Sequence, residues 1–236
     1  MIVVIQCAGS KRPDAGTLRT KDGEPVKFVA RPDLAPEDGF TYARPDDLSD
    51  QGANWRELLQ RYNQDAGNNP LRLLPACELY EKSIYQQLAE KVGRQRLFIL
   101  SAGWGLISAD YLTPDYDITF SASGGKENAY KRRKKGDGYS DFSMLPPDTT
   151  DPILFFGGKD YVPHFLALTG GLSAPRTVFY ASAAKPNAPD CSLVHFGKPF
   201  TNWHYSCAKA FLDGTLTHAA YTSMDAAYAK SYRLSY

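Results

Sequence analysis

Residues 97–107, LFILSAGWGLI, decide the fold class of this chain. The run 97–102 has no alternation of polar and apolar positions, which predicts a strand buried on both faces. It breaks at once into Gly103-Trp104-Gly105, a turn at the carboxyl end of that strand. Ligands of open α/β sheets bind beyond the carboxyl ends of the strands. We therefore expect the functional site near this turn.

Three further apolar runs, 2–7, 153–156 and 177–181, also end in small residues, and 193–196 is a shorter strand candidate. Helical spacing or boundary residues predict helices at 55–62, 78–92, 203–212 and 224–232. Strands that alternate with helices favour an α/β fold with a mostly parallel central sheet flanked by helices.

Two segments interrupt this pattern, and we expect both to be loop-rich insertions into a single α/β domain spanning residues 1–236. The first, 12–70, is rich in Pro, Gly and Asp over residues 12–53, where 26–29 and 40–42 are predicted to pair as a hairpin. The second, 121–149, places glycines around a basic run. Long insertions at the ligand edge of a sheet are often functional.

Composition limits the classes of function. The net charge of +1 provides no global field for nucleic acid, so such a partner needs a local basic patch. The four cysteines lack metal-ligand spacing and indicate reduced thiols. No apolar run approaches the ~20 residues of a membrane span, and the N-terminus does not resemble a signal peptide. We expect a cytoplasmic protein without a membrane partner.

Two groups of cations are candidate phosphate contacts. A glycine turn with a hydroxyl and two cations, as at Ser10, Lys11 and Arg12, suits an anion, although the spacing of a P-loop is missing. A basic run in a neutral chain concentrates positive potential and is predicted to contact DNA. The alternative for both groups is a solvated polar loop. The run consists of Lys131, Arg132, Arg133, Lys134 and Lys135.

Carboxylates follow the 97–107 stretch closely. A carboxylate at a cleft edge can orient water or stabilise a developing cation. We take Asp117 as the first catalytic candidate and Asp110 as the second, with the Ser101 hydroxyl beside them. Aspartate is also common in turns, so each is open to a structural interpretation. Asp115 and Asp117 have no accompanying His or Glu, so we expect neither a metal nor another cofactor.

Flat side chains could form a base pocket, because nucleobases are held by stacking and by hydrogen bonds to their edges. Trp104 is expected to project from its turn as a stacking residue. Packing in the core is the alternative for these aromatics. The candidates are Trp104, Tyr80, Tyr116, Asn202 and His204.

Four motifs occur in an order that resembles a bacterial family related to the peroxide-stress protein YaaA. They are C-x-G-S-K at 7–11, L-Y-x-x-S at 79–83, I-L-S-A-x-x-G-L-I at 99–107 and Y-D at 116–117. The resemblance implies an α/β fold associated with DNA or modified nucleobases, in which some relatives resemble DNA glycosylases that remove hypermodified phage bases. It covers roughly half of the chain and neither insertion, so it assigns no substrate or catalytic residue.

These observations together predict a hydrolase that cleaves the N-glycosidic bond of a modified base in DNA, as in defence against phage. A non-catalytic DNA-binding or stress-protection protein is the first alternative. A small-molecule nucleoside hydrolase or transferase is the second, and it would not need the basic run. The oligomeric state is not predicted.

Overall fold

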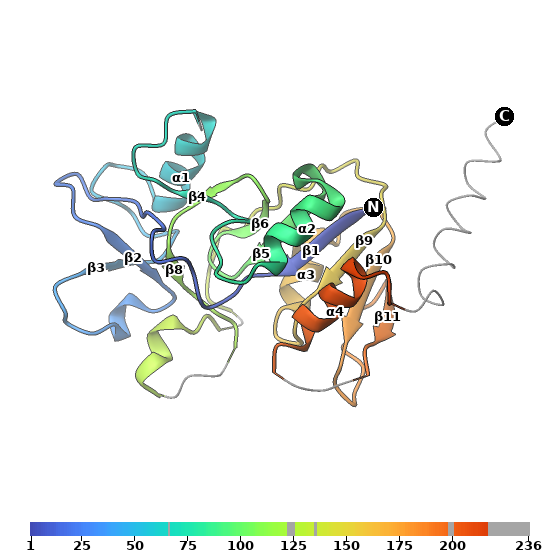
Figure 1. The fold of residues 1–236 in the computed structure, drawn as a ribbon. Helices are drawn as coiled ribbons and strands as arrows, with labels where there is room; N and C mark the ends of the chain where they lie inside the picture. The colour runs from blue at the N-terminus through green and yellow to red at the C-terminus, as the bar shows by residue number, and fades with distance from the viewer. Residues whose placement is uncertain (66, 122–125, 135, 198–200, 217–236) are drawn as a thin grey trace.

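The centre of the molecule is a six-stranded sheet in the order β11-β10-β9-β1-β5-β6 (Figure 1). Five strands are parallel and β6 is antiparallel to β5, which confirms the predicted α/β class with a mostly parallel sheet. The computed structural model describes residues 1–216 except 66, 122–125, 135 and 198–200. The strands are β1 (Ile2–Gln6), β5 (Leu97–Ser101), β6 (Gly105–Ser108), β9 (Ile153–Phe156), β10 (Arg176–Tyr180) and β11 (Cys191–His195).

Helices cover both faces of this sheet because successive side chains of a strand point to opposite faces. Phe155 of β9 stacks on Phe165 of α3 (Val162–Thr169), with ring centres 4.4 Å apart. The next residue, Phe156, packs against Phe211 of α4 (Trp203–Leu212) on the other face. Helix α2 (Ile84–Val92) packs beside α4. Among the described residues, no helix is long and apolar enough to cross a membrane.

The strand order reverses between β1 and β9. From β1 the chain crosses through α2 to β5 on one side, and it later returns to add β9 on the other side. The loops that leave these two strands are tied together, since the Gly158 N–H donates to the Gln6 side-chain oxygen at 2.6 Å. Such a switch point is where open α/β sheets bind ligands.

A second sheet, with the order β3-β2-β8, lies beside the first (Figure 1). Strands β2 (Val26–Val29) and β3 (Thr41–Ala43) lie in segment 12–70, which was expected to be the first insertion, and β8 is Tyr116–Asp117. The predicted hairpin is wrong because β2 and β3 pair in parallel. The remaining elements are α1 (Trp55–Gln64), β4 (Leu74–Pro75), β7 (Leu112–Thr113) and the 3₁₀ segments η1 (Pro32–Leu34), η2 (Arg94–Arg96) and η3 (Lys126–Lys131).

Helix α2 begins at Ile84, six residues later than predicted. The preceding residues pair with the loop after β1 instead. The Arg12 N–H donates to the Leu79 carbonyl at 2.8 Å, and Lys11 and Tyr80 form an isolated antiparallel β-bridge. This tertiary pairing competes with the helix for the same backbone groups. The predicted helix at 224–232 lies outside the described residues.

Two buried arginines attach the two predicted insertions, 12–70 and 121–149, to the turn after β5. Arg56, from the first insertion, donates to the Gly103 carbonyl at 2.9 Å, and Arg133, from the second, donates to the Ala102 carbonyl at 2.8 Å. Asp46 pairs with Arg56 at 2.6 Å, and Asp141 pairs with Arg133. Arg56 also lies 3.7 Å from Asp141, so the two pairs form one network. We call these four residues the arginine clamp.

The clamp overturns the expected role of Arg133 as a phosphate contact. Its side chain is only 7% exposed, and its guanidinium is used inside the protein. A buried charge is tolerated when it is paired and hydrogen-bonded. Arg133 therefore points into the protein and is not part of an exposed basic surface.

We predict that Arg133→Ala lowers the free energy of unfolding by about 3–5 kcal/mol, because it leaves the Asp141 carboxylate buried without its main partner. The neighbouring Arg132 is exposed, and Arg132→Ala should change stability by no more than about 0.5 kcal/mol. Urea unfolding of the two variants measures both values. Equal stabilities would show that the clamp does not hold the fold.

Candidate functional site

A cleft of about 610 Å³ opens at the switch point. We call it the switch-point cleft. The loop after β1 forms one wall, and Asp117 of β8 with residues of η3 and the adjoining chain forms another. Its lining includes Gln6, Cys7, Ala8, Gly9, Arg31, Asp117, Thr119, Asn128, Lys131, Arg132, Lys134, Tyr161, Asn202 and Tyr205. Both insertions thus contribute to a site at the edge of the central sheet.

A neighbouring cavity of about 550 Å³ extends along the ends of β9 and β10. It shares Gln6, Tyr161 and Asn202 with the switch-point cleft. The Gly157-Gly158 turn after β9 forms part of its wall. The two cavities therefore form a continuous crevice across the switch point.

The loop after β1 offers unused backbone donors. Within the described chain, the N–H groups of Ala8, Gly9 and Ser10 have no hydrogen-bond partner. Ala8 and Gly9 line the cleft, and a Cβ built on Gly9 would meet no atom within 4 Å. Ser10 is exposed next to them. Successive free N–H groups in a turn suit an anion.

Asp117 and Lys131 form an ion pair inside the cleft, with Nζ and Oδ2 2.6 Å apart. Burial lowers the pKa of Lys131, but its hydrogen bond and charge attraction to Asp117 outweigh this and leave the pKa raised. The Asp117 side chain remains 47% exposed. A ligand can therefore still reach this carboxylate.

Positive charge dominates the lining of the cleft. Arg31, Lys131, Arg132 and Lys134 line it, whereas Asp117 is the single lining carboxylate among the described residues. Arg31 is paired with Asp33 at 2.8 Å. In the part of the chain that the structure describes, Arg132 and Lys134 have no ion-pair partner. Lys135, the last member of the predicted run, lies outside the described residues.

Lys11 and Arg12 do not line the cleft, in contrast to the prediction. The Lys11 ammonium donates to the Tyr116 carbonyl and lies 4.0 Å from the centre of the Tyr116 ring. Burial lowers the pKa of Lys11, against the attraction of Cys7, Asp117 and Asp115. Arg12 is paired with Asp14. Both cations are engaged within the protein.

Ser101, Tyr80 and Tyr116 form a buried hydroxyl network beneath the site. The Ser101 hydroxyl donates to the Tyr116 hydroxyl at 2.9 Å and accepts from the Trp104 N–H at 3.1 Å. The Tyr80 and Tyr116 hydroxyls are 2.9 Å apart, and all three residues are at most 2% exposed. The expectations that Ser101 is catalytic and that Tyr80 stacks on a base are wrong, because neither side chain is accessible.

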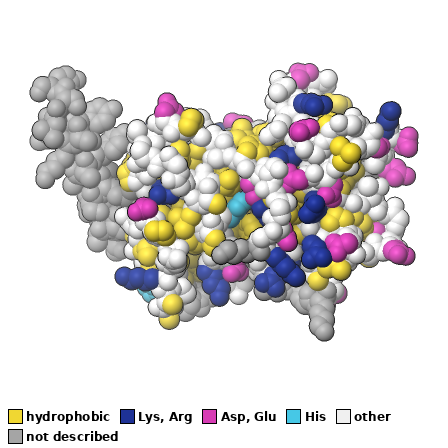
Figure 2. All heavy atoms as spheres, turned by 180° about the vertical axis from the view of Figure 1, so that it is seen from behind, with side chains coloured by type: hydrophobic (Ala, Val, Ile, Leu, Met, Phe, Trp, Pro, Cys, Tyr) yellow, Lys and Arg dark blue, Asp and Glu magenta, His cyan; other side chains and the backbone are white. Residues whose placement is uncertain are grey.

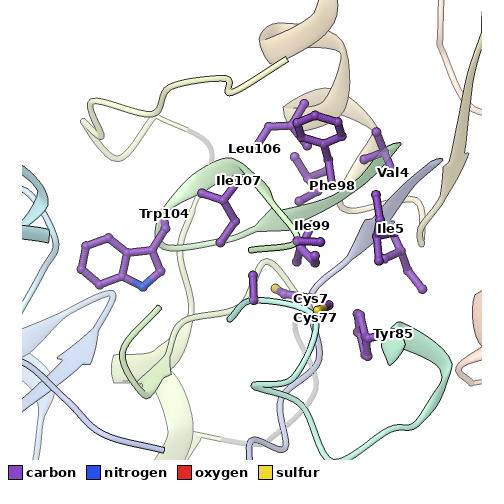
Figure 3. Packing of buried hydrophobic residues seen from close by; sticks show 14 of the residues in the cluster. Val4, Ile5, Cys7, Cys77, Tyr85, Phe98, Ile99, Trp104, Leu106 and Ile107 are labelled. Carbon is purple, nitrogen blue, oxygen red and sulfur yellow. The ribbon is translucent and has the colours of Figure 1, made fainter. Parts of the chain in front are cut away.

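Trp104 is completely buried, so the expected stacking role is wrong. Figure 3 shows its indole at the edge of the labelled cluster, and the Phe28 ring of β2 packs against it at 5.0 Å. The arginine clamp holds the carbonyl of Gly103, directly before Trp104, and the first insertion covers the indole. The turn directs Trp104 into the hydrophobic core, where Phe28 and Trp55 belong to the same cluster.

Asp110 lies outside the switch-point cleft. Its side chain is 60% exposed and pairs with Arg94 at 2.8 Å, and Arg94 also pairs with Glu78. The second catalytic candidate is therefore a surface ion-pair partner. Of the predicted carboxylates, the structure brings Asp117 to the cleft.

Asn202 and His204 lie near the start of α4. Asn202 lines both cavities and adopts a left-handed backbone conformation (φ 66°), and its amide makes no capping bond. Such strain at a non-glycine residue is found at functional sites. His204 lines the second cavity but is only 4% exposed. Burial lowers its pKa to about 4, so the imidazole is neutral at neutral pH.

Tyr161 and Arg31 line the cleft but were not singled out from the sequence. The Tyr161 hydroxyl lies 3.3 Å from the Cys7 sulfur, and burial raises the tyrosine pKa well above its ordinary value. Tyr161 follows the glycine turn after β9, so the rule that ligands bind at strand ends could have found it. Arg31 lies in an Ala-Arg-Pro-Asp segment with no such signal.

Among the described residues, no group of three or more His, Cys, Asp or Glu side chains is placed to hold a metal ion. No family model, curated protein or solved structure matches this chain. The resemblance to the YaaA-related family stays a prediction, and the function is inferred from the geometry of the site.

Two buried histidines predict acid sensitivity. Burial lowers the pKa of both His164 and His204 to about 4 in the folded protein, against ~6.5 when unfolded. The unfolded chain therefore binds more protons between these values, so stability is full above pH ~6.5 and is lost as the pH falls toward 4. At pH ~5.5 each histidine should cost about 1.4 kcal/mol of folding free energy.

Urea unfolding between pH 7.5 and 5.5 measures this loss. His164→Gln and His204→Gln should each flatten the dependence. A wild-type stability that stays constant over this interval would contradict the prediction.

Proposed function

We propose that this protein binds a phosphate-bearing nucleoside unit of DNA in the switch-point cleft and hydrolyses the N-glycosidic bond to its modified base. One observation carries the proposal: the Asp117 carboxylate lines the same cleft as the unpaired N–H groups of the loop after β1. Anion-binding donors and an accessible carboxylate thereby line one cleft.

The phosphate would be bound by backbone and side-chain donors together. The N–H groups of Ala8 and Gly9 would donate from one wall, and the unpaired cations Arg132 and Lys134 would approach from the other. Free N–H groups in a turn and flexible cations are a recurrent combination at phosphate sites. The cleft volume of about 610 Å³ is in the usual range for a small ligand.

Asp117 would act on the sugar. Cleavage of the C1′–N bond develops positive charge on the sugar ring, and a nearby carboxylate stabilises that charge. Water then forms the C1′–O bond, one of its protons passes by way of the carboxylate to solvent, and the departing base nitrogen takes up a proton. Asn202 lines the same cleft, and its amide would supply hydrogen bonds to the substrate.

A free nucleotide is the second candidate substrate, and the divided basic run favours it. Arg133 is buried and Lys131 is paired with Asp117, so two members of the run remain unpaired among the described residues. On the face shown in Figure 2, Lys and Arg atoms are interleaved with Asp and Glu atoms. With two unpaired members of the run lining the cleft, a single phosphate has more support than a long DNA track.

Asp117→Asn should lower base release by at least about 10²-fold, because the amide keeps the shape of the carboxylate but loses its charge and basicity. Asp110→Asn is the matched control and should retain the wild-type rate, since Asp110 lies outside the cleft. Plain and hypermodified DNA, and the corresponding nucleotides, are incubated with each protein. Abasic sites and free base are then measured.

Base release that is unchanged in Asp117→Asn would exclude this carboxylate. If the wild type releases no base from any of these substrates, the glycosidic proposal fails and a non-catalytic binding protein takes its place.

The salt dependence of binding separates the two substrates. If DNA is bound along its phosphates, replacing both Arg132 and Lys134 with Gln should reduce the log–log salt slope by about 0.9 for each lost contact. Arg61→Gln is the control, because Arg61 is a 64% exposed cation that does not line the cleft and should not contribute to the slope. A slope that the double variant leaves unchanged would favour the free nucleotide.

A further inference from the structure

A third cavity, of about 310 Å³, lies on the other side of Asp117. Asp117 lines both this cavity and the switch-point cleft. The second sheet supplies its wall through β2, β3 and β8, and Tyr130 of η3 completes it. Because its lining includes Phe40, Tyr42, Tyr116 and Tyr130, we call it the aromatic pocket.

We propose that the aromatic pocket is the subsite for the nucleobase, and that it selects a heteroaromatic ring with an exocyclic amino group. This inference rests on the proposed function, since it places the base of the same substrate. The residues first expected to hold the base do not offer a surface for it, because Trp104 and Tyr80 are buried.

The rings of the pocket are suited to stacking. Phe40 is 47% exposed, although a phenylalanine is usually buried. The Lys27 ammonium lies 3.1 Å from the centre of its ring and holds it at the rim of the pocket. Tyr42 and Tyr130 meet edge to face at 6.1 Å, and the Tyr42 hydroxyl donates to Asp38 at 2.9 Å. These contacts fix the aromatic side chains before a ligand arrives.

The charged residues of the two cavities favour different parts of the substrate: the switch-point cleft suits the phosphate and the aromatic pocket suits the base. Four cations and one carboxylate line the switch-point cleft, whereas Lys27, Asp115 and Asp117 are the charged residues in the described lining of the aromatic pocket. Two carboxylates disfavour a phosphate in the pocket. They accept hydrogen bonds from amino groups, which is how acidic side chains recognise bases with an exocyclic amine.

Asp115 is the acceptor that this proposal assigns to the amino group. Its side chain is exposed, and it has no ion-pair partner within the described residues. Its backbone N–H donates to the Gly16 carbonyl at 2.8 Å, so the turn does not depend on the carboxylate. With the base beside Asp115 and the phosphate at Gly9, the sugar lies next to Asp117, which is common to both cavities.

The test uses the fluorescence of 2-aminopurine riboside, an amino-bearing nucleoside without phosphate, whose emission is quenched when it stacks. Phe40→Ala should weaken its binding about 5- to 150-fold, the effect of removing one aromatic platform for a base. Leu48→Ala is the matched control: Leu48 is 77% exposed, it lies outside both cavities, and its removal should change nothing.

Asp115→Asn tests the recognition of the amino group. It replaces a charge-assisted hydrogen bond with a neutral one of roughly half the strength, so binding of 2-aminopurine riboside should weaken about fivefold. Binding of purine riboside, which lacks the amino group and is measured by its competition with the fluorescent probe, should not change. Equal weakening for both nucleosides would assign Asp115 a structural role and overturn the selectivity.

The outcomes for the pocket and for the proposed function are separable. If Phe40→Ala binds the riboside as tightly as the wild type, the base subsite is overturned even where the wild type releases base. If binding depends on Phe40 but no substrate releases base, the glycosidic proposal fails and the subsite stands. If the wild type binds neither riboside, the subsite is overturned.

Discussion

The arginine clamp ties segments 12–70 and 121–149 to the end of β5. Two guanidinium groups, from segments 77 positions apart in the sequence, donate to the consecutive carbonyls of Ala102 and Gly103. Carbonyls at the end of a buried strand need partners, and charged donors make strong hydrogen bonds to them. Because Arg56 and Arg133 belong to different insertions, the same contacts join the insertions to each other and to the central sheet.

The position of the candidate site follows from the attachment of segments 12–70 and 121–149 to the central sheet. Asp117 pairs with Val29 of β2 in the second sheet, so the first insertion places the carboxylate. Lys131, from the second insertion, pairs with that carboxylate. The loop after β1 comes from the central sheet alone. A cleft with both anion donors and a carboxylate therefore requires all three parts to meet, which the clamp ensures.

Much of the fold could be predicted from the sequence because the central strands are long apolar runs with small residues at their ends. Helix α4 was predicted at its observed bounds, whereas α3 was not predicted, since its eight residues are apolar on most sides and lack a periodic stripe. Asp117 could be placed near the site because it follows the Leu97–Ser101 strand closely and ligands bind beyond the carboxyl ends of strands. Asn202 could be placed there because it directly precedes a predicted helix.

The wrong predictions for site residues have one physical cause. The sequence does not show which distant residue a polar or aromatic side chain contacts in the folded protein. Arg133 looks like its neighbours in the basic run until Asp141 and the Ala102 carbonyl are known. Trp104 looks exposed until Phe28, from a segment far away in the sequence, packs against it. The aromatic pocket is hidden for the same reason, because Phe40, Asp115 and Tyr130 converge only when the two insertions meet.

In the proposed function, the loop after β1 and Asp117 form one binding site for a phosphate-bearing nucleoside. A decisive experiment is an NMR titration of ¹⁵N-labelled protein with a 2′-deoxynucleoside 5′-monophosphate. We expect saturable shifts of the Ala8, Gly9 and Asp117 amides, and no shift of the first two with the nucleoside alone. Shifts confined to other surfaces, with the Ala8 and Gly9 amides unmoved at saturation, would contradict it.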